Sequence, residues 1–173
     1  MHVMTVLMRD NHAEIEPLLK LSAARGVGHC ITLLSKNGYR RGHGEDEWPQ
    51  VQVSQELLRL WEAYPHFRVF RSYLERVGSF LSGGEMPACH AGSQSFNVDH
   101  LGNVSPCIEK IDLMMGNVRA QGLGDILESG KTKLPGLSGC QDCWTLCRGF
   151  AQTMGQGGEA SGWRDLMTRM RSR

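Results

Sequence analysis

The stretch CHAGSQSFNVDHLGNVSPC, residues 89–107, decides the fold of the second half of this chain, because it carries a cysteine at each end of a hairpin pattern. Its segment SQSFNVD predicts one strand, residues 100–103 predict the turn, and NVSP predicts the partner strand. A hairpin with a thiol at each outer end can present both sulfurs to one ligand. The stretch therefore predicts a small β-hairpin that supplies two ligands to a metal site.

A second group of cysteines lies in CQDCWTLC, residues 140–147. The chain turns tightly in a C-x2-C motif, so both sulfurs can reach one metal ion or one face of a cluster. Four thiolates suit either tetrahedral zinc or an iron–sulfur cluster. Zinc ribbons usually pair two short knuckles, whereas 17 residues separate Cys89 from Cys107. This spacing favours a cluster, and a zinc-stabilised binding or scaffold module with four cysteine ligands remains the alternative.

The composition argues against two classes of partner. The 19 lysines and arginines balance 18 aspartates and glutamates, a net charge of +1, which gives no electrostatic reason to expect nucleic acid or an acidic membrane surface. No apolar run approaches the roughly 20 residues of a membrane-spanning helix, and the first residues do not form a secretory signal. We therefore expect a cytoplasmic protein whose six cysteines are reduced, and such thiols more often bind metal or perform redox chemistry than form disulfides.

The first half of the sequence alternates between strand and helix patterns. Residues 2–8 and 27–35 are apolar and β-branched enough for buried strands. Asn11 can cap a helix between them, although Pro17 leaves the start of that helix open. Two further helical patterns follow, Leu57, Leu60, Trp61 and Tyr64, and then Phe67, Phe70, Leu74 and Val77. This order implies parallel strands. Two such strands do not complete a sheet, so the chain either pairs with another chain or is the C-terminal part of a longer protein.

The cysteine pattern resembles a known family. From Cys89 through Gly102 to Cys107 the spacing is C-x12-G-x4-C, which is similar to the C-x(9–15)-G-x4-C signature of the SPASM and twitch auxiliary domains of radical S-adenosylmethionine enzymes. The GNV at 116–118 and the later C-x2-C also follow that family's order. The stretch VLMRDN, ending in Asn11, resembles the late barrel strand that ends in an asparagine near bound S-adenosylmethionine. The resemblance thus implies a cofactor-binding role for Asn11.

The resemblance also implies a fold and a domain organisation. We expect an α/β protein in which residues 1–82 form the C-terminal strands and helices of a partial (β/α) barrel. A SPASM or twitch-like auxiliary cluster domain, a small β-hairpin plus helix, would follow over residues 83–150. Residues 151–173 would form a C-terminal tail with a docking helix that has a basic outer face. In that tail, the apolar residues of the predicted helix are Trp163, Leu166, Met167 and Met170.

The departures from the family pattern limit what the resemblance implies for cofactors. A full SPASM domain has seven cysteines and two auxiliary [4Fe–4S] clusters, whereas five cysteines lie in this region. We therefore expect one auxiliary [4Fe–4S] cluster, with metal ligands drawn from Cys89, Cys107, Cys140, Cys143 and Cys147. Cys147 is either a spare thiol or a replacement for Cys140 or Cys143. In this role the cluster would serve electron transfer or substrate positioning in radical chemistry.

The chain also lacks a C-x3-C-x2-C motif, which in the family binds the catalytic cluster. S-adenosylmethionine and a second [4Fe–4S] cluster are therefore expected only in a full-length parent, and this chain alone is predicted to be inactive. The expected partners are the missing N-terminal barrel half or a partner chain, together with an electron donor or acceptor protein. A stand-alone iron–sulfur electron carrier is a further alternative.

Several other residues suggest a functional role but have a simpler interpretation. Cys30 lies in the middle of a predicted strand, where core packing accounts for it. His29 and His43 are isolated and are expected to be solvated or hydrogen-bonded rather than metal ligands. Arg40 and Arg41 follow a strand end and could hold a carboxylate or phosphate, yet a charged loop is the simpler interpretation. Trp144 is expected to shield the cluster from water.

Overall fold

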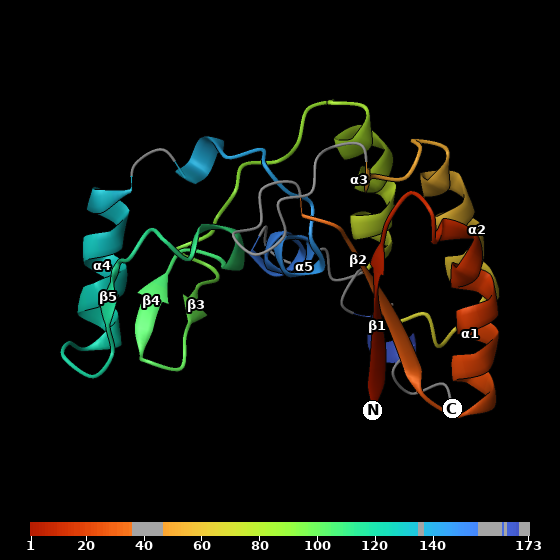
Figure 1. The fold of residues 1–173 in the computed structure, drawn as a ribbon, viewed down its shortest axis with the longest axis horizontal. Coiled ribbons are helices and arrows are strands. Elements are labelled where there is room, and N and C mark those ends of the chain that lie inside the picture. The colour runs from red at the N-terminus through yellow and green to blue at the C-terminus, as the bar shows by residue number, and fades with distance from the viewer. Residues whose placement is uncertain (36–46, 135–136, 156–163, 165, 170–173) are drawn as a thin grey trace.

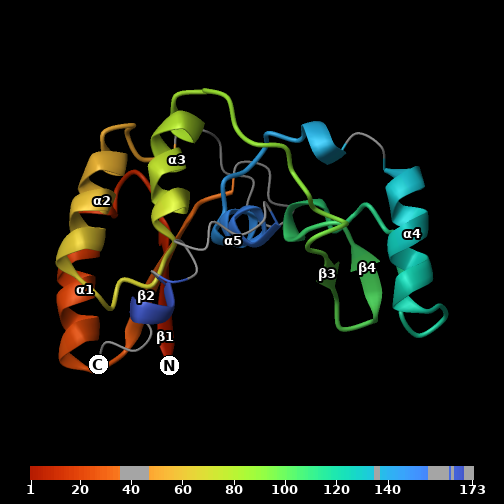
Figure 2. The same ribbon diagram turned by 180° about the vertical axis from the view of Figure 1, so that it is seen from behind.

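The computed structural model describes residues 1–35, 47–134, 137–155, 164 and 166–169. Helices and strands are mixed, and the chain forms two parts that lie on either side of helix α5, Leu146–Gly155 (Figures 1 and 2). Arg40, Arg41 and His43 lie outside the described residues, so their predicted roles stay predictions.

The first part contains the predicted pair of parallel strands. Strands β1, His2–Leu7, and β2, Gly28–Leu33, pair in register with His2 opposite Gly28 and Leu7 opposite Leu33. A short 3-10 helix, His12–Glu14, leads into α1, Ile15–Ala24, between them. Pro17 is therefore the third residue of α1, within the first turn, where its missing N–H is tolerated. The parallel arrangement predicted from the element order is confirmed.

Two further helices, α2, Val53–Ala63, and α3, Arg71–Leu81, complete this part. The apolar spacing in the sequence places Phe67 in the same helix as Phe70, Leu74 and Val77. This prediction is wrong for Phe67, because α3 begins at Arg71. Phe67 instead forms an isolated parallel bridge with His29, in which the His29 N–H donates to the carbonyl of His66 at 2.9 Å and the Arg68 N–H donates to the carbonyl of His29 at 2.7 Å. The backbone at Phe67 is thus used to extend the open edge of β2, and α3 begins four residues later.

The main hydrophobic core lies in this part. It joins the inner faces of β1 and β2 to α1, α2 and α3, and helices α1 and α2 lie on one side of the strand pair (Figure 1). Trp144, from the second half of the sequence, belongs to the same core and is 1% exposed. The two halves of the sequence are therefore packed together rather than joined by a linker alone.

The second part is smaller and contains the predicted hairpin. Strands β3, Asn97–Val98, and β4, Asn103–Ser105, pair in antiparallel fashion, as predicted, but they are shorter than the sequence pattern suggested. A third strand, β5, Gly116–Asn117, pairs with β4, and helix α4, Leu123–Lys133, packs against it. The core between these elements consists of Val104, Met115 and Ile126.

The architecture agrees with an α/β fold that has small sheets. A partial barrel is not confirmed, because the described residues contain one two-stranded parallel sheet and one three-stranded antiparallel sheet. Helix α5 continues past residue 150, the position after which the C-terminal tail was expected to begin.

Farther along the chain, Leu166 packs against the main core. The Arg169 guanidinium lies 3.3 Å from the centroid of the Trp61 ring.

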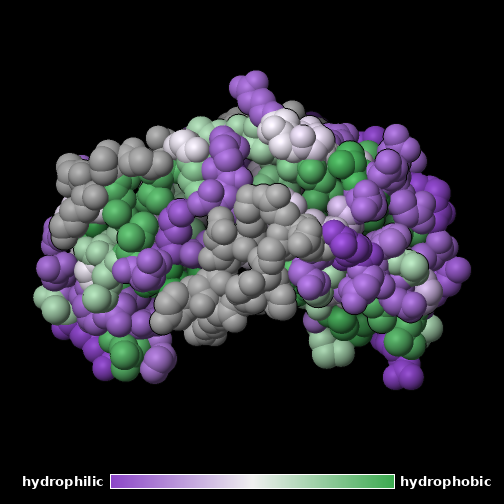
Figure 3. Space-filling model, turned by 45° about the horizontal axis from the view of Figure 1, so that its top comes forward, coloured by the Kyte–Doolittle hydropathy of each residue, from purple (hydrophilic) through white to green (hydrophobic). Residues whose placement is uncertain are grey.

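The visible face of the first part, on the right in Figure 3, is largely hydrophilic with smaller hydrophobic areas. Among the described residues, no helix has the length and apolarity required to cross a membrane.

Candidate metal centre

The turn of the hairpin is held by one carboxylate. Asp99 Oδ1 accepts hydrogen bonds from the backbone N–H groups of Leu101 at 2.8 Å and Asn103 at 2.9 Å, and its Oδ2 accepts a bond from Asn103 Nδ2 at 2.9 Å. These bonds, first among them the one from the Asn103 side chain, lower the pKa of Asp99. Gly102 occupies the left-handed region with φ of 86°, which favours glycine. The turn thus closes the loop that separates Cys89 from Cys107.

The GNV stretch secures the hairpin from its other side. Asn117 Nδ2 donates to the Leu101 carbonyl at 3.1 Å and to Asn103 Oδ1 at 2.9 Å. A Cβ atom on Gly116 would come within 2.9 Å of Ile126 Cγ1, so glycine at this position allows α4 to approach β5 closely. The two residues therefore hold the three short strands and α4 together.

The second group of cysteines lies on a turn and on the start of a helix. A 3-10 helix, Leu137–Gly139, precedes Cys140, whose N–H donates to the Leu137 carbonyl at 3.1 Å. Cys143 follows in the C-x2-C turn, and Cys147 is the second residue of α5. The chain therefore folds back from the hairpin side to bring this segment against the first group.

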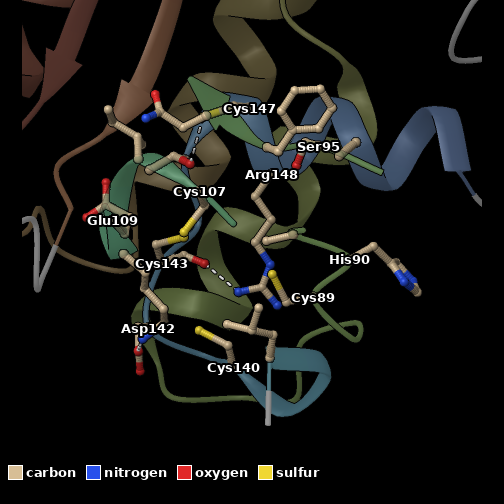
Figure 4. A pocket seen from close by; sticks show the side chains of 18 of the residues that line it. Cys89, His90, Ser95, Cys107, Glu109, Cys140, Asp142, Cys143, Cys147 and Arg148 are labelled. Atoms are coloured by element: carbon tan, nitrogen blue, oxygen red, sulfur yellow. Dashed lines mark hydrogen bonds and ion pairs between the residues drawn. The ribbon is translucent and has the colours of Figure 1, made fainter. Parts of the chain in front are cut away.

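All five predicted cysteine ligands line a single cavity of about 350 Å³. Figure 4 shows Cys107 and Cys143 on one side of the labelled group and Cys89 and Cys140 on the other, with Arg148 reaching between them from α5. The Cys89 and Cys143 residues are buried, at 8% and 9% exposed, whereas Cys147 is exposed. The structure thus brings together residues that are up to 58 positions apart in the sequence.

Burial strongly affects the acidity of these thiols. It raises the pKa of the Cys143 thiol to about 12, and it also raises the pKa values of Cys107 and Cys140. The nearby Arg148 guanidinium acts in the opposite direction on the pKa of Cys143. Because metals bind the thiolate form, loading of this site must release protons from buried thiols.

The spacing of the ligands bears on which metal group fits. Within the part of the chain that the structure describes, no three histidine, cysteine, aspartate or glutamate side chains converge closely enough to hold a single metal ion. Zinc requires four ligand sulfurs at about 2.3 Å from one point. A four-iron cluster takes its thiolates at separate irons, so thiols spread around a cavity fit it better than they fit zinc.

Charged side chains surround the cavity on several sides. Lys110 Nζ pairs with Asp142 Oδ2 at 2.8 Å, and this contact raises the pKa of Lys110. Glu109 Oε2 accepts a hydrogen bond from the Ser35 hydroxyl, which ties the second part to the end of β2. Arg148 is buried and donates to backbone carbonyls of Cys143 and Pro87.

The other residues singled out in the sequence lie elsewhere. Asn11 does not line the cavity; its Nδ2 donates to the Val6 carbonyl at 2.8 Å, and its Oδ1 accepts from the Met8 N–H at 2.9 Å. The Asn11 amide thus closes the turn after β1. It makes no side-chain capping bond to the following helix, so the expectation that Asn11 caps that helix is wrong. Its role toward a cofactor stays a prediction.

Two further residues have structural roles. Cys30 packs against the main core, and its thiol contacts the Arg68 carbonyl at 3.1 Å, which agrees with core packing. Trp144 does not line the cavity, and its expected role in shielding the cluster from water stays a prediction. Its indole instead stacks on Tyr73 with ring centroids 5.7 Å apart, and its Nε1 donates to the Tyr73 carbonyl at 2.9 Å.

Sequence reasoning missed Arg148 as a component of the cavity. The residue directly follows Cys147, so its proximity to the ligands was visible in the sequence. The inward orientation of its side chain could not be predicted from the sequence, because an arginine early in a helix most often faces solvent. The carbonyls of Cys143 and Pro87, brought together by the tertiary fold, hold the guanidinium inside.

Comparisons with known proteins bear on the same segment. Searches of curated proteins and of solved structures gave no match. Residues 89–144 match the SPASM family model, described as an iron–sulfur cluster-binding domain. That segment includes four of the five cavity cysteines, with Cys147 just beyond its end. The match therefore indicates iron–sulfur cluster binding and is consistent with a SPASM domain of a radical S-adenosylmethionine enzyme.

Proposed function

We propose that this chain binds one auxiliary [4Fe–4S] cluster in the cavity lined by its five clustered cysteines, as the C-terminal part of a radical S-adenosylmethionine enzyme. The observation that carries the proposal is that the hairpin pair and the C-x2-C pair line one cavity. The SPASM match over the same residues supports it. A bound cluster of this kind supplies one-electron transfer.

The residues of the chain would divide the work as follows. Cys89, Cys107, Cys140 and Cys143 would hold the cluster from different positions around the cavity wall. Four cysteine ligands leave no iron open, which favours electron transfer or a structural role over direct binding of substrate to iron. Apolar side chains in the cavity wall limit access of water to the sulfurs; they include Phe96, Ile108, Leu137 and Ala151.

The larger enzyme context rests on the first part of the chain. Among the described residues, the outer edge of β1 has no strand partner, and Val3 and Met4 on this strand are 41% and 58% exposed. Such an edge supports pairing with further barrel strands, supplied by a longer parent protein or by a partner chain. The proposed location is the cytoplasm, and the proposed redox partner is an electron donor or acceptor protein. Without a C-x3-C-x2-C motif, this chain alone would not cleave S-adenosylmethionine.

The metal content tests the proposal directly. After anaerobic reconstitution with iron and sulfide, the purified chain should be brown and should contain about four irons and four sulfides per chain, as one [4Fe–4S] cluster requires. The oxidised protein should be silent in electron paramagnetic resonance, and the reduced protein should give a signal from one cluster. One zinc per chain with no sulfide would overturn the proposal and establish the zinc-stabilised module instead.

A further inference from the structure

Arg148 is the buried cation of the metal centre. It lies on α5 and is 6% exposed, yet it lines the same cavity as the cysteines. Its Nη1 donates to the Cys143 carbonyl at 2.6 Å, and its Nη2 donates to the Pro87 carbonyl at 2.7 Å. Its Nε is buried and has no hydrogen-bond partner. A polar group of this guanidinium is therefore left unsatisfied at the cavity.

The charge of Arg148 is also uncompensated. Among the described residues its hydrogen-bond partners are the two carbonyls, and none of the carboxylates pairs with it. The two acidic side chains at the cavity are otherwise engaged, since Asp142 pairs with Lys110 and Glu109 bonds to the Ser35 hydroxyl. The guanidinium also lies 5.5 Å from the centroid of the Trp144 ring, which provides only a weak electrostatic contact.

A buried charge without a partner is costly, because the interior does not replace its hydration. The cost is removed if an anion shares the cavity. A [4Fe–4S] core in its oxidised state carries a charge of +2, so with four thiolates the whole unit has a net charge of −2. One added electron makes it −3, with no bond formed or broken and no proton taken up.

We infer that Arg148 is the counter-charge of the cluster and raises its reduction potential, a conclusion that rests on the proposed function. A fixed cation close to the cluster stabilises the −3 state more than the −2 state, because the interaction grows with the charge. Net charge around a cluster is one of the properties that set its potential. The low exposure of Arg148 keeps solvent from screening this effect. The reducing electron comes from a one-electron, low-potential donor.

The test compares variants of the reconstituted chain by potentiometric titration with dithionite, monitored by electron paramagnetic resonance. Arg148→Gln retains hydrogen-bonding capacity and removes the charge, whereas Arg148→Lys retains the charge and loses the planar fork. Arg119→Gln is the matched control, because Arg119 is an exposed arginine of the same part that donates to the His100 carbonyl at 3.1 Å. Iron and sulfide are measured in every sample.

The equilibrium constant for reduction should fall at least tenfold in Arg148→Gln, which is about 59 mV for a one-electron couple. It should change less than threefold in Arg148→Lys and in Arg119→Gln. If Arg148→Gln does not load iron while Arg148→Lys does, the cluster requires the positive charge for binding itself, which supports the inference.

Three results would overturn the inference without contradicting cluster binding by the unaltered chain. The first is an unchanged potential in an iron-loaded Arg148→Gln variant. The second is an equal shift in Arg148→Gln and Arg148→Lys, and the third is a failure of both variants to load. The last two would show that the guanidinium acts through its hydrogen bonds and not through its charge. Failure of the unaltered chain to load iron would instead overturn the proposed function.

Discussion

His29 links the stability of the first part to pH. The side chain is completely buried, with Nε2 2.9 Å from the Thr5 hydroxyl and Nδ1 2.8 Å from the Ser22 hydroxyl. Burial, with a smaller contribution from His66, lowers the pKa of His29 below its ordinary value of 6.5. The unfolded chain therefore binds more protons than the folded chain once the pH falls below about 6.5, and stability decreases there.

This dependence should be visible in urea unfolding of the cluster-free protein at pH 7.5 and pH 5.5. The unfolding midpoint should fall at the lower pH, and it should fall less in His29→Gln, which has no group to protonate. A His100→Gln variant is the control, because His100 is an exposed histidine on the hairpin turn. An equal fall in His29→Gln and in the unaltered chain would contradict the expected role of His29.

The ligand set can be separated residue by residue. We expect Cys89, Cys107, Cys140 and Cys143 to hold the cluster, so a serine at any of these positions should lose most of the iron. Cys147→Ser should keep nearly normal iron content, because Cys147 is the exposed thiol of the five and its sulfur already lies 3.3 Å from the Thr145 hydroxyl. Cys30→Ser is the control from outside the cavity. If Cys147→Ser loses iron while Cys140→Ser or Cys143→Ser retains it, the predicted ligand set is wrong and Cys147 is one of the ligands.

At the scale of elements, the hairpin depends on one left-handed residue. An alanine at position 102 would have to adopt φ of 86°, and its Cβ would approach Asn117 Oδ1 to 3.1 Å. We expect Gly102→Ala to reduce the free energy of unfolding by about 1–2 kcal/mol, the usual cost of a left-handed conformation for an L-residue. Chemical unfolding of the apoprotein measures this change.

A second glycine in the same part serves as the control for the hairpin variant. A Cβ on Gly124 would meet nothing within 4 Å, and Gly124 lies in α4, where alanine is the better helix former. Gly124→Ala should therefore leave stability unchanged or raise it. Equal losses in the two variants would show that the conformation at Gly102 is not the limiting feature.

The elements that could be predicted from sequence are those set by local rules. The parallel strands follow from buried β-branched runs, and the hairpin follows from Asp99 and Gly102, whose turn chemistry is local. Strand β5 was missed because a strand of two residues is too short to show an alternating pattern of apolar and polar residues. Its pairing depends on the close contact between Gly116 and α4. Phe67 was misassigned because its apolar spacing fits a helix, whereas the open edge of β2 determines its conformation.

The cavity shows the same division between local and tertiary information. The cysteine spacing indicated that the hairpin and the C-x2-C turn would contribute to one site, and their cysteines do line one cavity. The directions of Trp144 and Arg148 were not predictable, because each is held by backbone carbonyls contributed by distant segments. The indole turns into the main core, and the guanidinium turns into the cavity.

At the scale of the whole molecule, the two parts depend on the cluster to very different extents. The first part has a large core whose buried residues run from Leu7 to Met86 and also include Trp144. The second part has Val104, Met115 and Ile126 as its buried apolar core, and it places the cysteines around a cavity instead of around packed side chains. A domain with so small a core usually needs metal or disulfides to remain folded. The proposed cluster would therefore supply much of the folding free energy of the second part.

Removal of the cluster should for this reason unfold one part selectively. With the cluster bound, amide hydrogen exchange should show protection in β3, β4, β5 and α4; after anaerobic chelation of iron, we expect protection in these elements to fall by a factor of about ten or more. Protection in β1, β2, α2 and α3 should change much less, because their core does not include the cavity. Helix α5 is the informative boundary, since it carries Cys147 and Arg148 at the cavity and also packs on α3. Its first turn should lose protection while the rest keeps it. Uniform loss throughout the chain would contradict this division, because it would show that the two parts unfold as one cooperative unit.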